Sequence, residues 1–143
     1  MDATSHHNTS QDKTLSGLSI LFAEDDPLAA LLVCEELQDR GARVVHAGDG
    51  QRALDFFHQD EYDLVISDIH MPHINGIELL IALRSESGVP FIGLSGNAHD
   101  LDGRTLIEAG ALAVLPKPFD RKRLEMILIE HGLLVGAGLS NQS

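Results

Sequence analysis

The sequence predicts an α/β fold in which a five-stranded, doubly wound parallel sheet lies between two layers of helices. Five short apolar runs alternate with longer stretches in which apolar residues recur every three or four positions. Several of the runs are continuously hydrophobic, which is typical of parallel strands that are covered on both faces. Parallel strands need crossover connections, and right-handed crossovers place helices on both sides of the sheet.

Five strands are expected, at residues 19–23, 42–46, 62–66, 89–94 and 111–115. The first helix is expected to begin at Pro27 with Asp26 as its N-cap, because proline has no N–H to leave unpaired and a carboxylate accepts hydrogen bonds from the amides of the first turn. Apolar stripes mark the core faces of three helices: Ala30, Val33 and Leu37; Ile77, Leu80 and Ile81; and Leu124, Ile127 and Leu128. Glycines that favour a left-handed backbone follow four helical stretches: Gly41, Gly88, Gly110 and Gly132.

Length and composition favour a single domain. The chain has 143 residues, and we expect the folded domain at residues 18–132. Residues 1–17, which are mostly polar, and residues 133–143, which contain glycine and serine, are expected to be flexible tails. The single cysteine, Cys34, lies in an apolar stretch and is expected to fill space in the core.

Charge and hydropathy exclude two classes of partner. The chain carries 22 acidic and 10 basic residues, a net charge of −12 with neutral histidines, which opposes binding to nucleic acid or to anionic membrane surfaces. No apolar run approaches the roughly 18 residues that span a bilayer, and the first residues do not have the pattern of a secretory signal. We therefore expect a soluble, cytoplasmic protein with no membrane insertion and no bound nucleic acid.

Polar side chains gather where four of the expected strands end. They are Glu24, Asp25 and Asp26 after the first strand, Ser67 and Asp68 after the third, Ser95, Gly96 and Asn97 after the fourth, and Lys117 after the fifth. Ligands of open parallel sheets bind beyond the carboxyl ends of the strands. Three crowded carboxylates repel one another unless a hard cation such as Mg²⁺ lies between them, so Glu24, Asp25 and Asp68 are candidate metal ligands.

A lysine and a hydroxyl complete this set. Lys117 and Ser95 are suited to hold a tetrahedral anion beside the cation. A carboxylate in such a setting can accept a phosphoryl group, because phosphoryl transfer depends mainly on positioning and on neutralised charge. Each feature alone is common as a helix cap, a turn former or a loop, but the coincidence of all four at one sheet edge favours the functional interpretation.

These residues and their surroundings resemble the receiver domains of two-component response regulators. The similarity covers about residues 18–132 and includes the stretches YDLVISDIHMPHINGIELL, FIGLSGNA and LPKPF. It implies a flavodoxin-like three-layer fold with strand order 2-1-3-4-5 and a phosphoacceptor at Asp68. The acidic pair of the family matches Glu24 and Asp25, its hydroxyl residue matches Ser95, and its lysine matches Lys117.

The resemblance also implies finer roles at the site. The backbone carbonyl of His70 would be a ligand of Mg²⁺, and the backbone amides of Ile69 and Gly96 would meet phosphoryl oxygens. The peptide bond after Lys117 would be cis. Pro116 is compatible with the fifth strand, because that strand lies at the edge of the sheet in the implied order.

The sequence departs from the family at Val114. Receivers usually carry tyrosine or phenylalanine three residues before the lysine, where the ring moves inward on phosphorylation, so the route from Asp68 to the outer surface is open to question. His70 and Asn97 match positions that tune hydrolysis of the acyl phosphate, although the sequence favours a solvated loop residue at His70, because no feature fixes its ring. Five further histidines lack paired spacing and are expected to be surface or packing residues: His46, His58, His73, His99 and His131.

The expected function is that of a phosphoacceptor, not an enzyme, which takes a phosphoryl group from a histidine kinase or a histidine phosphotransfer protein. It would act on an unknown downstream protein as a stand-alone switch, or serve as a phosphate shuttle or sink. Three alternatives are a receiver segment of a hybrid histidine kinase, a docking module that is not phosphorylated, and a Mg²⁺-dependent phosphohydrolase with an aspartyl-phosphate intermediate. The hydrolase is less favoured, because such enzymes commonly place a second acid two residues after the nucleophile, where this chain has His70.

Overall fold

A computed structural model describes residues 13–96 and 101–135 of the chain. Its centre is a sheet of five parallel strands in the order β2-β1-β3-β4-β5. The strands are β1 (Ser19–Ala23), β2 (Arg43–Ala47), β3 (Leu64–Asp68), β4 (Phe91–Ser95) and β5 (Ala113–Pro116). The predicted fold class and strand order are confirmed, and the strands begin and end within two residues of the predicted runs.

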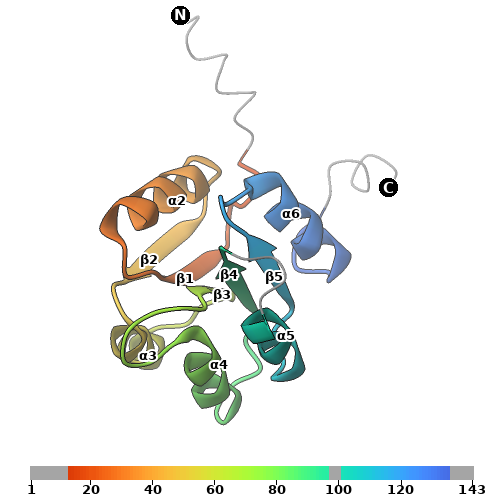
Figure 1. Cartoon of the computed structure of the whole chain (residues 1–143). Helices are drawn as coiled ribbons and strands as arrows, with labels where there is room; N and C mark the ends of the chain where they lie inside the picture. Colours follow the sequence, from red (N-terminus) through yellow and green to blue (C-terminus); the bar gives the residue numbers. More distant parts are fainter. Residues whose placement is uncertain (1–12, 97–100, 136–143) are drawn as a thin grey trace, which may run out of the picture.

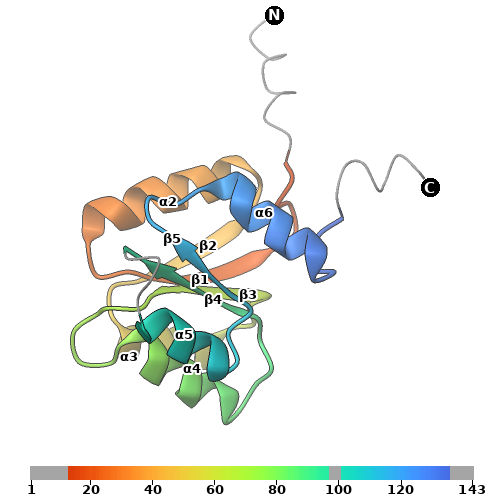
Figure 2. The ribbon, with the colours of Figure 1, turned by 45° about the vertical axis from the view of Figure 1, so that its right-hand side comes forward.

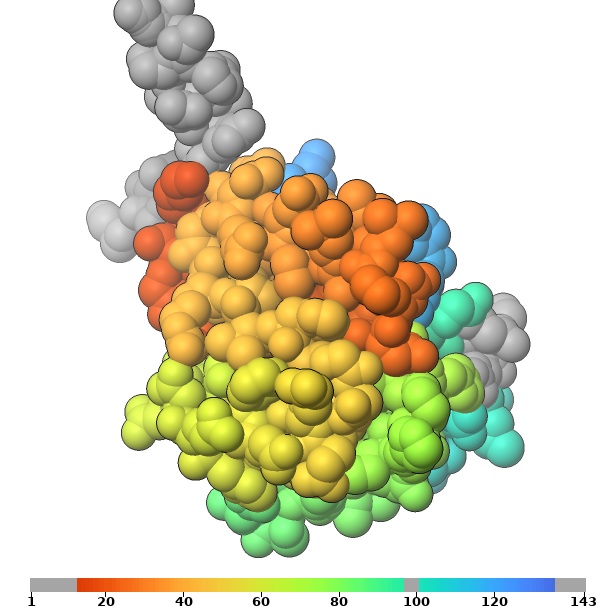
Figure 3. All heavy atoms as spheres, turned by 90° about the vertical axis from the view of Figure 1, so that its left-hand side faces the viewer, coloured from red at the N-terminus to blue at the C-terminus, as the bar shows by residue number. Residues whose placement is uncertain are grey.

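Helices cover both faces of the sheet (Figure 1, Figure 2). One face carries α2 (Pro27–Asp39) and α6 (Arg121–Glu130), and the other carries α3 (Gly50–Gln59), α4 (Gly76–Arg84) and α5 (Leu101–Glu108). Seen from the β2 edge, residues from α2, β2 and α3 form one continuous surface (Figure 3).

The sheet divides the core into two apolar halves. In β1, Phe22 packs in the half beneath α2 and α6, whereas its neighbour Leu21 packs in the half beneath the other helices. In β3, Ile66 and Val65 divide in the same way. Successive residues of a strand point to opposite faces, so a strand that is covered on both faces needs the continuous apolar run seen in the sequence.

Capping side chains fix the helix starts. The Asp26 carboxylate accepts hydrogen bonds from two amides in the first turn of α2, and Pro27 is the first helical residue, as predicted. Asn75 and Glu78 form a capping box at the start of α4. These caps limit the length of the strand-to-helix loops and hold the loops at the carboxyl edge of the sheet.

Two details of α4 and its surroundings differ from the sequence predictions. Ile81 is 57% exposed, because the buried face of α4 is formed by Leu79, Leu80 and Leu83. Gly88 does not have a positive φ, since α4 ends well before it, whereas the other three glycines predicted to be left-handed do have one.

The folded part begins before residue 18. Leu15 is fully buried in the half of the core beneath α2 and α6, and its amide donates to the carbonyl of Arg40 at 2.8 Å. The Thr14 hydroxyl donates to the carboxylate of Glu125 in α6 at 2.5 Å. The prediction of a flexible tail is therefore wrong for residues 13–17. The sequence could not indicate the burial of Leu15, because a single leucine in a polar segment forms no periodic apolar pattern.

Three further residues belong to the same half of the core. Cys34 packs against it, as predicted. Leu133 and Leu134 also pack against it, so the predicted C-terminal tail begins two residues too early. Within the described ranges, no helix is long and apolar enough to cross a membrane.

Candidate functional site

The carboxyl ends of four strands bring the predicted site residues together. β1 and β3 are neighbours in the sheet, so Glu24, which follows β1, faces Asp68 at the end of β3. Glu24 is 2% exposed, Asp68 is 6% exposed, and Ser95 at the end of β4 is 1% exposed. Lys117 follows β5 and completes the group from the edge of the sheet.

Glu24 and Asp25 lie in the short loop between β1 and α2. The Glu24 amide donates to the carbonyl of Ala47 at 3.0 Å, and the Glu24 carboxylate accepts from the amide of Asp26 at 3.1 Å. Asp26 is also the N-cap of α2, so the turn that begins the helix directs Glu24 inward. Asp25 remains exposed to solvent.

Lys117 links the buried acidic residues. Its Nζ lies 2.8 Å from Asp68 Oδ2 and 3.4 Å from Glu24 Oε1. Its backbone amide donates to the carbonyl of Ser95 at 2.9 Å, which attaches this loop to β4. The Lys117–Pro118 peptide bond is cis, as the family resemblance implies.

The charges of the site shift two pKa values. Burial raises the pKa of Glu24 and the charge of Asp68 adds to this, although the Asp26 amide and Lys117 act in the opposite direction. Burial alone would lower the pKa of Lys117, but the hydrogen bond and charge of Asp68, together with the charge of Glu24, outweigh it and raise this pKa. The site therefore concentrates negative charge around the Lys117 ammonium group.

Three carboxylates are close enough to share one metal ion. Glu24, Asp25 and Asp68 each offer an oxygen that lies within 4.8 Å of the others. Carboxylate oxygens are the hard ligands that Mg²⁺ prefers, and a divalent cation would reduce the repulsion that raises the pKa of Glu24. The donor set therefore fits the predicted ion, and the exposed Asp25 offers a ligand on the solvent side.

The prediction that the Ile69 amide binds the phosphoryl group is wrong. The Ile69 amide donates to the carbonyl of Leu94 at 3.1 Å and so continues the pairing of β3 with β4. The His70 amide, in contrast, donates to Asp68 Oδ1 at 3.1 Å. Successive amides of an extended chain point in opposite directions, so an error of one residue exchanges an amide that faces the site for one that faces a strand. The role of the His70 carbonyl stays a prediction.

Two segments border the acceptor. Gly96 is exposed, and a Cβ added there would meet nothing within 4 Å, so the backbone beside Ser95 is open to a ligand. Asn97 lies outside the described residues. The His70 side chain is 57% exposed, and its Nε2 lies 3.6 Å from Asp102 Oδ2 at the start of α5. This histidine is therefore solvated, and it also lies beside a carboxylate of α5.

Val114 lies next to α5. It is half-buried and lies beside Gly93 in the register of β4 and β5. A Cβ added at Gly103 of α5 would lie 3.6 Å from Val114, and Leu106 fills the space above Gly93. The place where the family usually has an aromatic ring is thus a half-buried valine next to α5.

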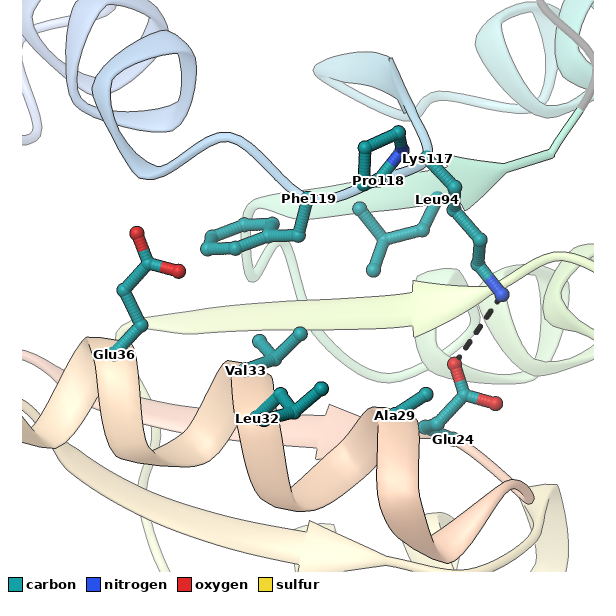
Figure 4. A pocket seen from close by; sticks show the side chains of 9 residues that line it. All are labelled: Glu24, Ala29, Leu32, Val33, Glu36, Leu94, Lys117, Pro118 and Phe119. Atoms are coloured by element: carbon teal, nitrogen blue, oxygen red, sulfur yellow. Dashed lines mark hydrogen bonds and ion pairs between the residues drawn. The ribbon is translucent and has the colours of Figure 1, made fainter.

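A cavity of about 330 Å³ opens beside the acidic site, between α2 and the chain that follows β5 (Figure 4). Its apolar lining consists of Ala29, Leu32, Val33, Leu94, Pro118 and Phe119. Glu24 and Lys117 lie at one end of the cavity and Glu36 at the other. On α2, Leu28 and Leu31 are 65% and 52% exposed, so apolar surface continues along this helix beyond the cavity.

His46 is a residue at the site that the sequence analysis missed. It lies at the end of β2, and its Nε2 is 2.8 Å from the carbonyl oxygen of Glu24. Its side chain is exposed, as expected for a surface histidine, but its spacing to other histidines gave no sign of this contact with the site. The signal that was available is its place at the carboxyl end of a strand, the same edge that carries the acidic cluster.

The sequence matches the family model of the response regulator receiver domain over residues 20–129. The chain belongs to this family and is a receiver domain of two-component systems. It is 40% identical over 105 residues to the transcriptional regulatory protein CpxR of Escherichia coli (strain K12), which covers 73% of this chain and 45% of CpxR. It is 30% identical over 117 residues to the sensor protein GacS of Pseudomonas syringae pv. syringae, which covers 78% of this chain and 13% of GacS. The chain thus spans less than half the length of these relatives.

Solved structures show the same fold with magnesium. The receiver domain of a sensor histidine kinase from Pseudomonas aeruginosa PAO1, with a magnesium ion coordinated in its active site cleft, is 30% identical with a TM-score of 0.73, covering 80% of this chain and 97% of that one. The response regulator TrrA of Thermotoga maritima, in complex with Mg²⁺-BeF, is 32% identical with a TM-score of 0.68, covering 79% and 97%.

Proposed function

We propose that this receiver domain takes a phosphoryl group from a phosphohistidine partner onto the carboxylate of Asp68, with Mg²⁺ held by Glu24, Asp25 and Asp68. The observation that carries the proposal is the contact of Lys117 Nζ with both Asp68 and Glu24 beside three carboxylates that can share a cation. The magnesium ion in the similar cleft of the Pseudomonas aeruginosa domain supports the choice of metal.

The two oxygens of Asp68 are oriented before any donor arrives. Oδ2 pairs with Lys117, and Oδ1 accepts from the His70 amide. In the transfer, one of these oxygens forms a bond to phosphorus while the P–N bond of phosphohistidine breaks, and the donor nitrogen keeps the electron pair of that bond. Mg²⁺, when bound, supplies positive charge beside the phosphoryl oxygens. The Lys117 ammonium, the Ser95 hydroxyl and the Gly96 amide would then hold the transferred group.

The phosphodonor in this proposal is a histidine kinase or a histidine phosphotransfer protein. Lys117, which contacts Asp68, also lines the apolar cavity next to α2. In this proposal the donor docks along α2, where it would bury the exposed surface of Leu28 and Leu31. Receiver domains accept phosphoryl groups from histidine kinases, which supports this class of donor.

The proposal describes an acceptor that holds the group, not an enzyme that turns over a substrate. The residue two positions after Asp68 is His70, so the second acid that hydrolases of this chemistry commonly use does not stand there. Both a stand-alone switch and a segment of a larger protein, such as a hybrid histidine kinase, are compatible with the share of CpxR and GacS that the chain covers. The downstream protein, the cytoplasmic location and the lack of nucleic-acid binding stay predictions.

Intact-mass spectrometry tests the proposal. Incubation with a small phosphodonor and Mg²⁺ is expected to add one phosphoryl group to the parent chain and none to Asp68→Asn, because an amide is a poor nucleophile and lacks the metal-binding charge. Asp55→Asn, at an exposed position on α3, is the matched control and should be labelled like the parent. Undiminished labelling of Asp68→Asn would refute the assignment, and multiple turnover of the donor to free phosphate would favour the hydrolase.

A further inference from the structure

We infer that His46 is a positioning residue for the metal site, because its ring holds the peptide group that joins Glu24 to Asp25. This inference rests on the proposed function, since it takes Glu24 and Asp25 as ligands of Mg²⁺. β1 ends at Ala23, so the Glu24 carbonyl lies beyond the last residue of that strand. His46 Nε2 lies 2.8 Å from this carbonyl oxygen and continues the link between β1 and β2 with a side chain.

The geometry determines which ring nitrogen carries the proton. A carbonyl oxygen can only accept, so Nε2 must be the donor and the neutral ring is the Nε2–H tautomer. The ring also has a fixed neighbour. His46 is the register partner of Phe22, which is fully buried, and the two ring centroids lie 6.2 Å apart with a tilt of 46°. The imidazole is exposed, and the buried Phe22 on one side and the hydrogen bond at its tip restrict its orientation.

The consequence for the acidic pair follows from its backbone. The Glu24 amide is already held by the carbonyl of Ala47 at 3.0 Å, so the main chain on the N-terminal side of Glu24 is fixed. The peptide group on the other side is shared by both proposed ligands, and its rotation would turn the Asp25 side chain relative to Glu24. With its carbonyl bonded to His46, this peptide group is fixed in the orientation that brings an oxygen of each carboxylate within 4.8 Å of Asp68.

Calorimetric titration of the full chain with Mg²⁺ tests this role. The variants replace His46 with side chains that differ in length and in whether they can donate a hydrogen bond. His46→Leu removes the donor, and His46→Asn carries an amide that is too short to replace Nε2. Both are expected to raise the dissociation constant for Mg²⁺ about tenfold, as loss of an outer-shell partner typically does. His46→Gln can place its amide near the position of Nε2 and should stay within about threefold of the parent.

His58→Leu is the matched control. His58 lies on α3, where its Nε2 is 2.8 Å from Glu86, and its removal should leave the Mg²⁺ affinity unchanged. Equal affinities of the parent, His46→Leu and His46→Asn would overturn the inference alone and leave the proposed function intact. A glutamine variant as weak as the asparagine variant would also overturn it. A parent chain that does not bind Mg²⁺ would overturn both the inference and the metal site of the proposed function.

Discussion

Glu24 is a carboxylate that the fold buries beside a second carboxylate. Its pKa is raised by burial and by the charge of Asp68, so the folded chain binds a proton at Glu24 more tightly than the unfolded chain does. The stability that this proton contributes is fully present below the ordinary glutamate pKa of 4.5 and is lost as the pH rises through the raised pKa of the folded state. At neutral pH and without a cation, the ionised Glu24 therefore lowers the free energy of unfolding.

The substitution Glu24→Gln is accordingly expected to stabilise the metal-free chain. Glutamine keeps an oxygen that can accept from the Asp26 amide, removes the buried charge and leaves Lys117 paired with Asp68. We expect the free energy of unfolding at neutral pH to rise by roughly 1 kcal/mol, the size of a typical single-residue effect. Urea unfolding in the presence of a chelator measures it, with the exposed Glu61→Gln as control. A less stable Glu24→Gln would mean that the ion pair with Lys117 outweighs the burial of charge.

Among the elements, α4 begins against the backbone of the acceptor. Its first residue is Gly76, whose amide donates to the Ile69 carbonyl at 2.8 Å. A Cβ added at Gly76 would lie 2.6 Å from the carbonyl oxygen of Asp68 and 2.9 Å from the Cα of Ile69. The contact leaves no room for a side chain, so the start of α4 and the end of β3 hold each other in place.

We therefore expect Gly76→Ala to destabilise the chain by about 1–3 kcal/mol, the usual cost of overpacking. The change in the urea midpoint measures it. Gly88→Ala is the matched control, because a Cβ there meets nothing within 4 Å and φ is not positive, so its effect should stay within about 0.5 kcal/mol. If Gly76→Ala were as stable as the control, the contact between α4 and the acceptor backbone would be looser than the geometry indicates.

The edge strand β5 carries Val114 at the place where the family usually has an aromatic ring, and this substitution predicts a weak response on the outer surface. Val114 has one preferred side-chain rotamer in most settings and packs against the half of the core that contains Leu106 of α5, so it has far less reach than a ring that moves between two positions. A metal-fluoride mimic of the phosphoryl group with Mg²⁺ should shift the amide NMR signals strongly around Asp68, Ser95 and Lys117. Signals of residues 112–125 outside the Lys117 loop should move only modestly. Large shifts there, or dimerisation through that face, would show that another side chain has replaced the aromatic switch.

For the whole molecule, the acidic cluster should couple metal binding to stability. Mg²⁺ would bind three carboxylates that are apart in the unfolded chain, and at about one hundred times the dissociation constant this linkage adds roughly 2.7 kcal/mol. The melting temperature should rise with Mg²⁺ in the parent and in Asp55→Asn, but much less in Asp25→Asn. Because Asp25 is exposed, its substitution should not disturb the fold, so a smaller rise would report loss of a metal ligand. Equal rises in the parent and in Asp25→Asn would place the cation elsewhere.

Much of this architecture can be predicted from the sequence because its signals are local. Continuous apolar runs locate the strands, Asp26 and Pro27 locate a helix start, and polar residues at strand ends locate the edge where Asp68 lies. The remaining features depend on contacts between distant segments. The link from His46 to Glu24 joins two strands, and the burial of Leu15 depends on helices far along the chain. The strand-end position of His46 indicates the edge of the sheet on which it lies, but no local pattern of residue types specifies either contact.

The docking of residues 13–17 also has a consequence for synthesis on the ribosome. Leu15 belongs to the same half of the core as Leu124 and Leu128, and Thr14 bonds to Glu125. Residues 14 and 15 therefore make contacts that form only when α6 is present. A nascent chain that has released β1 to β4 can form most of the sheet, but the face beneath α2 stays partly uncovered until α6 emerges. We expect a chaperone that binds exposed apolar surface to remain on this face until α6 is released.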